Sequence, residues 1–210
     1  MIVAIDGPAG AGKSTVARAL AERLQFRYLD TGAMYRALTW LAMQKGVDLG
    51  DAAALADLAR AEPVVFDAEG RVWIAGTDVT SSIREQRIDR MVPVVARHPA
   101  VREVMRERQR QLGREGDVVI EGRDIGTVVA PDAEVKVYLV ADRDERARRR
   151  SSERPGIGAD ALATDLKLRD ESDAARMEPA PDAREIDTTH LRVEDVVERI
   201  EALVRERTAA

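Results

Sequence analysis

The chain has 210 residues, of which 45% are hydrophobic and 34% are charged, and its formal net charge is -5 at pH 7. An acidic chain of this length suits one α/β domain and has no general attraction for nucleic acid or an anionic membrane. The absence of cysteine excludes disulfide scaffolds, thiolate nucleophiles and cysteine-based metal sites. No stretch is long and apolar enough to span a membrane, and the first residues resemble a buried strand rather than a leader peptide. We therefore expect a cytoplasmic protein.

Short apolar runs alternate with helical patterns along the chain, at residues 2–5, 26–29, 117–121, 135–140 and 184–187. Strands that alternate with helices form parallel sheets, because each crossover returns the chain to the same end of the sheet. We therefore predict an α/β fold in which a parallel sheet is covered by helices on both faces.

The pattern changes over residues 63–81, where two segments of alternating apolar residues flank a turn that contains Gly70. Glycine can adopt the positive φ of a tight hairpin, so we predict a small antiparallel insertion there. Helical spacing resumes over 83–92 and again from Pro99, a residue that suits the first turn of a helix. The last predicted element is an amphipathic helix over 193–207.

A glycine-rich segment from Gly7 to Ser14 follows the first predicted strand, precedes a helical run and satisfies the pattern G-x-x-x-x-G-K-S. Its glycines let backbone N–H groups turn toward phosphate oxygens, and the following helix adds its positive N-terminal end. We expect Lys13 between the β- and γ-phosphates of ATP and the Ser14 hydroxyl on Mg²⁺. The predicted ATP-binding residues of this P-loop are Gly7, Pro8, Ala9, Gly10, Ala11, Gly12, Lys13, Ser14 and Thr15.

Two other kinds of protein share parts of this pattern. The glycines also resemble a dinucleotide-binding loop, and Asp30 ends the second strand where a ribose-binding acid would lie. Lys13 and Ser14 have no task in such a loop but have defined roles around a nucleoside triphosphate. A P-loop alone is also compatible with a switch or binding protein that hydrolyses ATP.

Residues for a second substrate follow two further strands. Thr31 and Arg36 come after the second strand at the start of a helix, and Arg123 and Asp124 come after the third strand. Each pair taken alone could be a helix cap and a surface arginine. Because open α/β sheets bind ligands at the carboxyl ends of their strands, two such pairs favour a kinase with a small acceptor.

At this point the sequence resembles the bacterial cytidylate kinases of the nucleoside monophosphate kinase family. The likeness rests on segments in the family's order and spacing: GPAGAGKST, LDTGAMYR, IREQ, PAVREVMRERQR, EGRDIGTVV, ERARRR and LKLRDESDAAR. The resemblance implies one kinase domain over 1–210, with a P-loop core and a nucleotide-monophosphate-binding region over about 31–113 that includes the insertion. It also implies a short lid over about 146–160, and transfer of phosphate from ATP to CMP or dCMP with Mg²⁺.

The resemblance also implies roles for single residues. Arg36, Arg123 and Arg176 resemble the clamps on the CMP phosphate, and with Lys13 they form the expected catalytic set. Thr31 stands where the family has a small hydroxyl residue near the monophosphate.

For the nucleoside, Arg102 and Asp124 match positions that touch cytosine, and Arg169 and Asp173 resemble contacts to the sugar. Pro93 stands where many relatives have a serine near the base, so one base contact is lost or replaced by water.

The arginine-rich run at 145–150 leads into the predicted lid, because residues 151–158 have turn residues and little apolar content. Arg149 and Arg150 are the expected lid contacts to ATP, and Arg146 belongs to the same run. Glu121, at a strand end, is compatible with an outer-shell contact to Mg²⁺ or with an ordinary structural role. We expect a monomer whose partners are small molecules, with neither nucleic acid nor membrane. UMP or another small acceptor remains an alternative to CMP.

Overall fold

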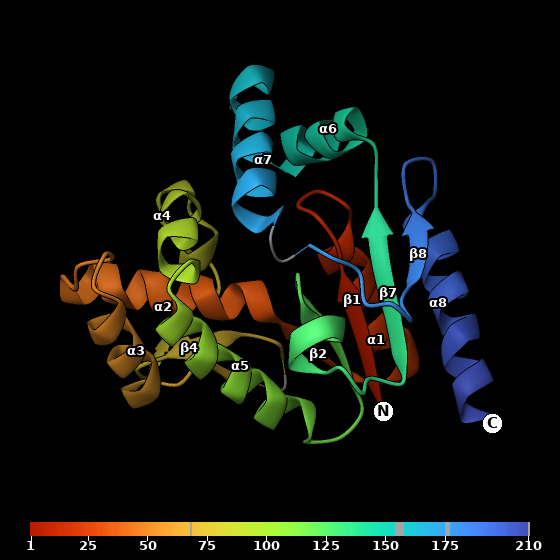
Figure 1. Ribbon diagram of the computed structural model, residues 1–210, viewed down its shortest axis with the longest axis horizontal. Helices are drawn as coiled ribbons and strands as arrows, with labels where there is room; N and C mark the ends of the chain where they lie inside the picture. The colour runs from red at the N-terminus through yellow and green to blue at the C-terminus, as the bar shows by residue number, and fades with distance from the viewer. Residues whose placement is uncertain (68, 154–157, 175–176, 210) are drawn as a thin grey trace. The chain divides into compact units, whose positions relative to one another are not determined.

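The computed structural model describes residues 1–67, 69–153, 158–174 and 177–209 (Figure 1). The chain divides into two compact units. We call Met1–Leu29 together with Gly116–Ala210 the core unit, and Asp30–Glu115 the inserted unit. The residue range of the inserted unit nearly coincides with that of the predicted nucleotide-monophosphate-binding region, 31–113. The prediction of a single domain stays a prediction.

The main sheet has five strands in the order β2-β6-β1-β7-β8. The strands are β1 (Ile2–Asp6), β2 (Arg27–Asp30), β6 (Val118–Glu121), β7 (Val135–Val140) and β8 (Arg184–Asp187). β1 pairs in parallel with β6 on one side and with β7 on the other, so that Val3 lies opposite both Val119 and Val135. β7 pairs in parallel with β8. The predicted parallel α/β sheet is confirmed.

Helices α1 (Lys13–Leu24) and α8 (Val193–Thr208) pack against each other and against this sheet. Figure 1 shows α8 alongside β7 and β8. Their apolar stripes join the strands in one core, in which Ile5, Leu20, Leu139 and Ile200 have no exposed surface. The burial of each such side chain contributes about 1.5–3 kcal/mol to the free energy of folding. The predicted amphipathic surface helix is therefore confirmed, and its apolar face joins the core.

Three further elements of the core unit follow β6 and β7. They are a single π-helical turn, η2 (Ile125–Val129), and the helices α6 (Arg143–Glu153) and α7 (Ala159–Asp173), which pack together. Residues 151–153 form the end of α6, although the sequence suggested an exposed connection from 151 onward. Pairs of Glu145 with Arg148 and Arg149, three and four residues apart, support this helix despite its low apolar content. Residues 154–157 of the predicted lid lie outside the described residues.

The inserted unit contains four α-helices, one 3-10 turn and a small sheet among its described residues. Its elements are α2 (Thr31–Lys45), α3 (Ala52–Ala61), β3 (Val65–Phe66), β4 (Val72–Ile74), β5 (Thr77–Asp78), η1 (Ser82–Arg84), α4 (Gln86–Ala96) and α5 (Pro99–Gly113). The strands pair antiparallel in the order β3-β4-β5, as predicted, and Gly70 has the expected positive φ of 75°. A second turn at Ala75 and Gly76, both with positive φ, lies at the end of the second apolar segment and leads into β5, a third strand that the sequence did not predict.

Packing in the inserted unit places α2 against α4 and α3 against α5. Pro99 opens α5, as expected, and the His98 ring before it donates from Nε2 to the carbonyl oxygen of Leu49 at 2.8 Å. Nowhere in the described part of the chain is a helix both long and apolar enough to cross a bilayer.

Candidate active site

The chain leaves β1 at Asp6 and turns at once into the glycine-rich loop. Gly7 has a φ of 144°, and a Cβ atom built there would lie 2.2 Å from the carbonyl oxygen of Leu139. At Gly10, with a φ of 79°, a Cβ would lie 2.9 Å from the Cβ of Arg146. No side chain fits at either place without a shift of the backbone, so the two glycines let the loop pass close to β7 and α6.

Lys13 begins α1 and folds back over the loop. Its Nζ donates a hydrogen bond to the carbonyl oxygen of Pro8 at 2.7 Å, and the side chain is buried. Burial, together with the nearby charge of Arg123, lowers the pKa of Lys13 to about 7, although Glu121 and Asp6 act in the opposite direction. The loop therefore encloses an amino group with a lowered pKa, and a bound anion would favour its charged form.

Ser14 contacts an acidic side chain from the neighbouring strand. Its hydroxyl donates to Oε1 of Glu121 at 2.8 Å, and the Tyr28 hydroxyl donates to the same oxygen at 2.9 Å. Glu121 is buried. A hydroxyl beside a carboxylate suits Mg²⁺, which prefers oxygen ligands and keeps several waters. Within the described residues no group of three or more acidic or histidine side chains forms a metal site by itself, so phosphate oxygens and water would complete the coordination.

Arg123 connects the segment after β6 to the loop. Its Nη1 donates to the carbonyl oxygen of Gly7 at 2.8 Å, and its Nε donates to Oδ2 of Asp173 at 2.9 Å. The guanidinium group is thus held between a backbone dipole and a carboxylate of α7.

Asp6 fixes the segment that carries Arg123 and Asp124. Its two carboxylate oxygens accept from the backbone N–H groups of Ile125 and Gly126, at 2.9 and 2.8 Å. Burial raises the pKa of Asp6, whereas these two hydrogen bonds act to lower it. Asp124 is buried and precedes η2, and its carbonyl oxygen accepts from Val128 at 2.9 Å.

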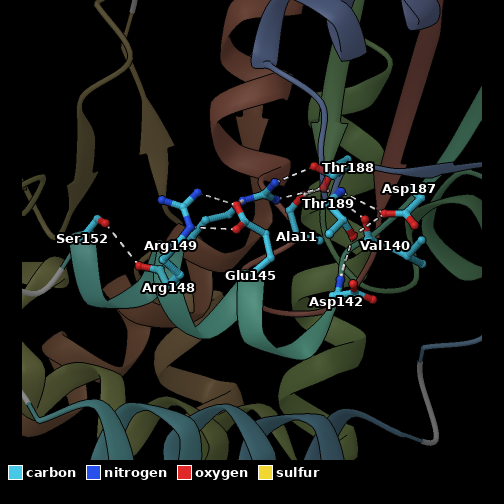
Figure 2. Close-up of polar contacts among 10 residues, drawn as sticks. All are labelled: Ala11, Val140, Asp142, Glu145, Arg148, Arg149, Ser152, Asp187, Thr188 and Thr189. Carbon is cyan, nitrogen blue, oxygen red and sulfur yellow. Dashed lines mark hydrogen bonds and ion pairs between the residues drawn. The ribbon is translucent and has the colours of Figure 1, made fainter.

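Arg149 of α6 reaches Thr188, which lies against Ala11 of the loop (Figure 2). Arg149 donates to the hydroxyl and the carbonyl oxygen of Thr188, at 2.9 and 2.6 Å, while the Thr188 hydroxyl lies 3.0 Å from the carbonyl oxygen of Ala11. Hydrogen bonds from Arg148 and Arg149 lower the pKa of Glu145 to about 2.

Arg146, a second arginine of α6, is buried more deeply than Arg149. It makes a bidentate pair with Asp170, at 3.0 and 2.8 Å, and donates to the carbonyl oxygen of Ala9 at 3.1 Å. Arg150 lies further along the same helix. The helix is therefore joined to the P-loop through backbone carbonyl groups.

A second group of charged side chains belongs to the inserted unit. Asp30 caps α2 by accepting from the N–H of Ala33 at 2.8 Å, and its other oxygen accepts from Nη2 of Arg84 at 2.8 Å. Burial alone would raise the pKa of Asp30, but the charge and hydrogen bond of Arg84 outweigh it, so the pKa is lowered. Asp30 is thus a helix cap and an ion-pair partner, which leaves the dinucleotide interpretation without its ribose-binding acid.

Arg36 lies one turn further along α2 than the buried Thr31 and donates from Nη1 to Oδ1 of Asp89 on α4. Arg102 of α5 places its guanidinium carbon 5.9 Å from the centre of the Tyr35 ring. The inserted unit therefore presents arginines whose side chains are already engaged by neighbouring residues.

A model of the family described as "Cytidylate kinase" matches residues 3–206. The chain belongs to the cytidylate kinase family. It is 50% identical over 216 residues to the cytidylate kinase of Geobacillus kaustophilus, covering 98% of this chain and 96% of that protein. It is 47% identical to a bifunctional pantoate ligase/cytidylate kinase of Synechococcus sp. (strain JA-3-3Ab), of which it spans 42%. A gluconokinase from Sinorhizobium meliloti 1021 has a similar fold, with a TM-score of 0.54, 14% identity and coverage of 99% of this chain and 93% of that one.

The structure places most of the residues predicted for this cytidylate kinase family member, each within its own unit. The core unit brings together Lys13, Ser14, Arg123 and Asp173, and the inserted unit holds Thr31, Arg36 and Arg102. Arg169 lies on α7, but its side chain is outside the described part of the chain, and Arg176 lies outside the described residues altogether.

Sequence reasoning missed several residues that hold this site. Asp6, Tyr28, Asp89 and Thr188 each bind a predicted residue or the segment that carries one. Only Asp6 had a usable local signal, because a carboxylate at a strand end directly before a P-loop is well placed to accept from the next crossover. The other three act on residues far away in the sequence.

Proposed function

We propose that this cytidylate kinase family member transfers the γ-phosphoryl group of ATP to CMP or dCMP, giving ADP and CDP or dCDP, with Mg²⁺ bound alongside ATP. The observation that carries the proposal is the arrangement of Lys13, Ser14 and Arg123 around one glycine-rich loop. These groups supply an ammonium, a metal-binding hydroxyl and a guanidinium, which are the parts that phosphoryl transfer requires.

On the ATP side, Lys13 would exchange the carbonyl oxygen of Pro8 for oxygens of the β- and γ-phosphates. Ser14, with Glu121 behind it, would hold Mg²⁺, which neutralises phosphate charge when bound. Arg149 and Arg150 would contact ATP as part of a lid over about 146–160. The hydrogen bond of Arg146 to the carbonyl oxygen of Ala9, and the contact of Arg149 with Thr188 beside Ala11, support this role for α6.

On the acceptor side, Arg36, Arg123 and Arg176 would grip the CMP phosphate, with Thr31 beside it. One oxygen of that phosphate forms the new bond to the γ-phosphorus while the bond to the departing ADP breaks. The attacking group is already an oxyanion near neutral pH, so no strong general base is needed. The protein's main task is to hold and neutralise two polyanions.

For the nucleoside, Asp124 would accept from the cytosine amino group and Arg102 would donate to its acceptor edge, because a carboxylate only accepts and a guanidinium only donates. Arg169 and Asp173 would contact the sugar. The pair of Asp173 with Arg123 supports a second task for Asp173, the orientation of a phosphate clamp.

A coupled assay for ADP release with CMP, dCMP, UMP, AMP, GMP and shikimate tests the proposal. We expect turnover with CMP and dCMP well above every other acceptor, and little ADP in the absence of an acceptor. Equal ADP release with and without acceptor would instead indicate an ATP-hydrolysing switch, and a preference for UMP or another acceptor would move the chain to a sister activity.

A further inference from the structure

In the pair of Arg36 with Asp89 both side chains are largely buried. The Asp89 side chain is 1% exposed and that of Arg36 is 16% exposed, whereas Arg84, which pairs with the buried Asp30, is 50% exposed, and Asp57 and Arg60 on α3 are 78% and 59% exposed. A carboxylate buried this deeply is costly unless a charge compensates it. Arg36 provides that charge, so the fold itself fixes where this guanidinium lies.

A fixed guanidinium is useful to a residue that binds phosphate. Free arginine carries about 2 kcal/mol of rotamer entropy, and a ligand that orders such a side chain loses affinity in doing so. In this chain the ordering occurs on folding, because Asp89 holds Nη1 of Arg36. The guanidinium is a planar group with five N–H donors, so fixing Nη1 also fixes the directions in which the whole group can donate.

The first turn of α4 is held in an unusual way. Pro93 lies inside this helix and has no N–H to donate to the carbonyl oxygen of Asp89, four residues earlier. The backbone N–H of Asp89 donates to the carbonyl oxygen of Glu85 at 3.2 Å, but the carbonyl oxygen of Asp89 receives no N–H from Pro93. Besides these backbone contacts, the side-chain pair of Asp89 with Arg36 ties this turn of α4 to α2.

We propose that Asp89 is a positioning residue for Arg36, and that its buried carboxylate sets the orientation in which Arg36 binds the phosphate of the acceptor nucleotide. This inference rests on the proposed function, in which Arg36 is a phosphate clamp. It assigns to Asp89 an effect on the affinity for the acceptor and none on the affinity for ATP.

The test compares Asp89→Ala, which removes the carboxylate, with Asp89→Asn, which keeps its size and one acceptor oxygen. We expect Asp89→Ala to raise the Kd for CMP about tenfold and Asp89→Asn to raise it less, by calorimetry on the full chain. The KM for ATP should not change, and inhibition by cytidine, which lacks the phosphate, should be unaffected. Asp57→Asn, which breaks the exposed pair on α3, is the matched control and should leave all of these values unchanged.

A second pair of variants shows whether Asp89 acts through Arg36. Two double variants are compared, Arg36→Ala with Asp89→Ala and Arg36→Ala with Asp89→Asn. Both should bind CMP equally weakly. Neither variant leaves a buried carboxylate without its partner, because position 89 carries no carboxylate in either. A difference between them that persists without Arg36, or an unchanged or tighter Kd for CMP in Asp89→Ala, would overturn the inference. If the Arg36→Ala forms bind CMP as tightly as the wild type, the clamp role of Arg36 itself fails instead.

Discussion

The two units hold Lys13 and Arg36, two of the cations that we expect to bind phosphate, in different ways. In the core unit, Lys13 donates to a backbone carbonyl group of the glycine-rich loop, although Arg146 and Arg123 of the same unit also pair with carboxylates. In the inserted unit, Arg36 pairs with the buried carboxylate of Asp89. A carbonyl dipole is part of the main chain and remains satisfied by water or by other donors, whereas a buried carboxylate depends on its cation.

We therefore expect the two cations to contribute differently. Removal of Lys13 should have little effect on folding, since the glycines and the strand end shape the loop. Removal of Arg36 should weaken folding as well as the proposed phosphate binding, because Arg36 neutralises a buried charge.

Lys13→Ala should reduce kcat by on the order of 10³-fold, because it removes the cation expected at the transferring phosphate. The thermal midpoint should stay close to that of the wild type, since burial disfavours the charged ammonium and offsets its attraction to Glu121 and Asp6. Steady-state kinetics and calorimetric unfolding give the two values. A folded Lys13→Ala protein with near-normal turnover would remove the loop from the mechanism.

Arg36→Ala should lower the free energy of unfolding by about 3 kcal/mol, because it leaves the Asp89 carboxylate buried without its cation. The double variant Arg36→Ala, Asp89→Ala should recover most of that loss, since it removes both charges. Denaturant titration measures each value. An Arg36→Ala protein as stable as the wild type would break the contrast between the two units.

Asp124→Asn should narrow the preference for CMP over UMP by about 1–3 kcal/mol, since the amide adds a donor where cytosine also presents one. The ratio of kcat/KM for the two acceptors is the measured quantity. Arg123→Ala serves as the control and should weaken both acceptors alike, because it acts on the phosphate. If the two variants behave identically, cytosine is recognised elsewhere, with Arg102 and the region of Pro93 as the next candidates.

Asp173→Ala should weaken CMP and dCMP together, because Arg123 loses the carboxylate that orients it. An additional loss of a few fold, about 1 kcal/mol, is expected for CMP alone, because only CMP has the 2′-hydroxyl that Asp173 can bind. Comparing kcat/KM for the two acceptors separates the two parts. Equal losses would leave Asp173 with the ion pair as its only role.

The binding of ATP should also change the protonation of Lys13. The pKa of Lys13 is lowered to about 7 in the free protein, so at pH 8 most of these side chains are neutral. Phosphate anions favour the charged form and raise the pKa, so ATP binding should take up close to one proton at pH 8. Calorimetry in buffers of different ionisation enthalpy measures the uptake, which Lys13→Met should abolish. Proton release, or an uptake that survives in Lys13→Met, would contradict this assignment.

The sequence predicted those features that depend on neighbouring residues. The P-loop, the strand and helix that flank it and the hairpin at Gly70 all follow from contiguous patterns, and each lies where expected. The cap at Asp30 is also a local arrangement, a carboxylate three residues before an N–H, but the sequence was considered there only for a ribose-binding acid.

The residues that hold the site in place could not be predicted in this way. Tyr28 contacts Glu121, Arg123 contacts Asp173 and Arg36 contacts Asp89 only because strand order and helix packing bring distant segments together. An isolated aspartate within an amphipathic helix, such as Asp89, looks like a solvated residue until the packing of α4 on α2 is known. The turn at Ala75 and Gly76 and the third strand after it were also missed, since Ala75 is an uncommon residue for a positive φ.

Phosphoryl transfer from ATP to CMP can be tested by following the transferred phosphate itself. The protein is incubated with ATP labelled at the γ-phosphate, Mg²⁺ and CMP, and the products are separated by chromatography. We predict that the label appears in CDP, that it appears in dCDP when dCMP replaces CMP, and that Lys13→Ala abolishes both products. Label found in inorganic phosphate at the same rate with or without CMP would contradict the account, because it would show hydrolysis in place of transfer.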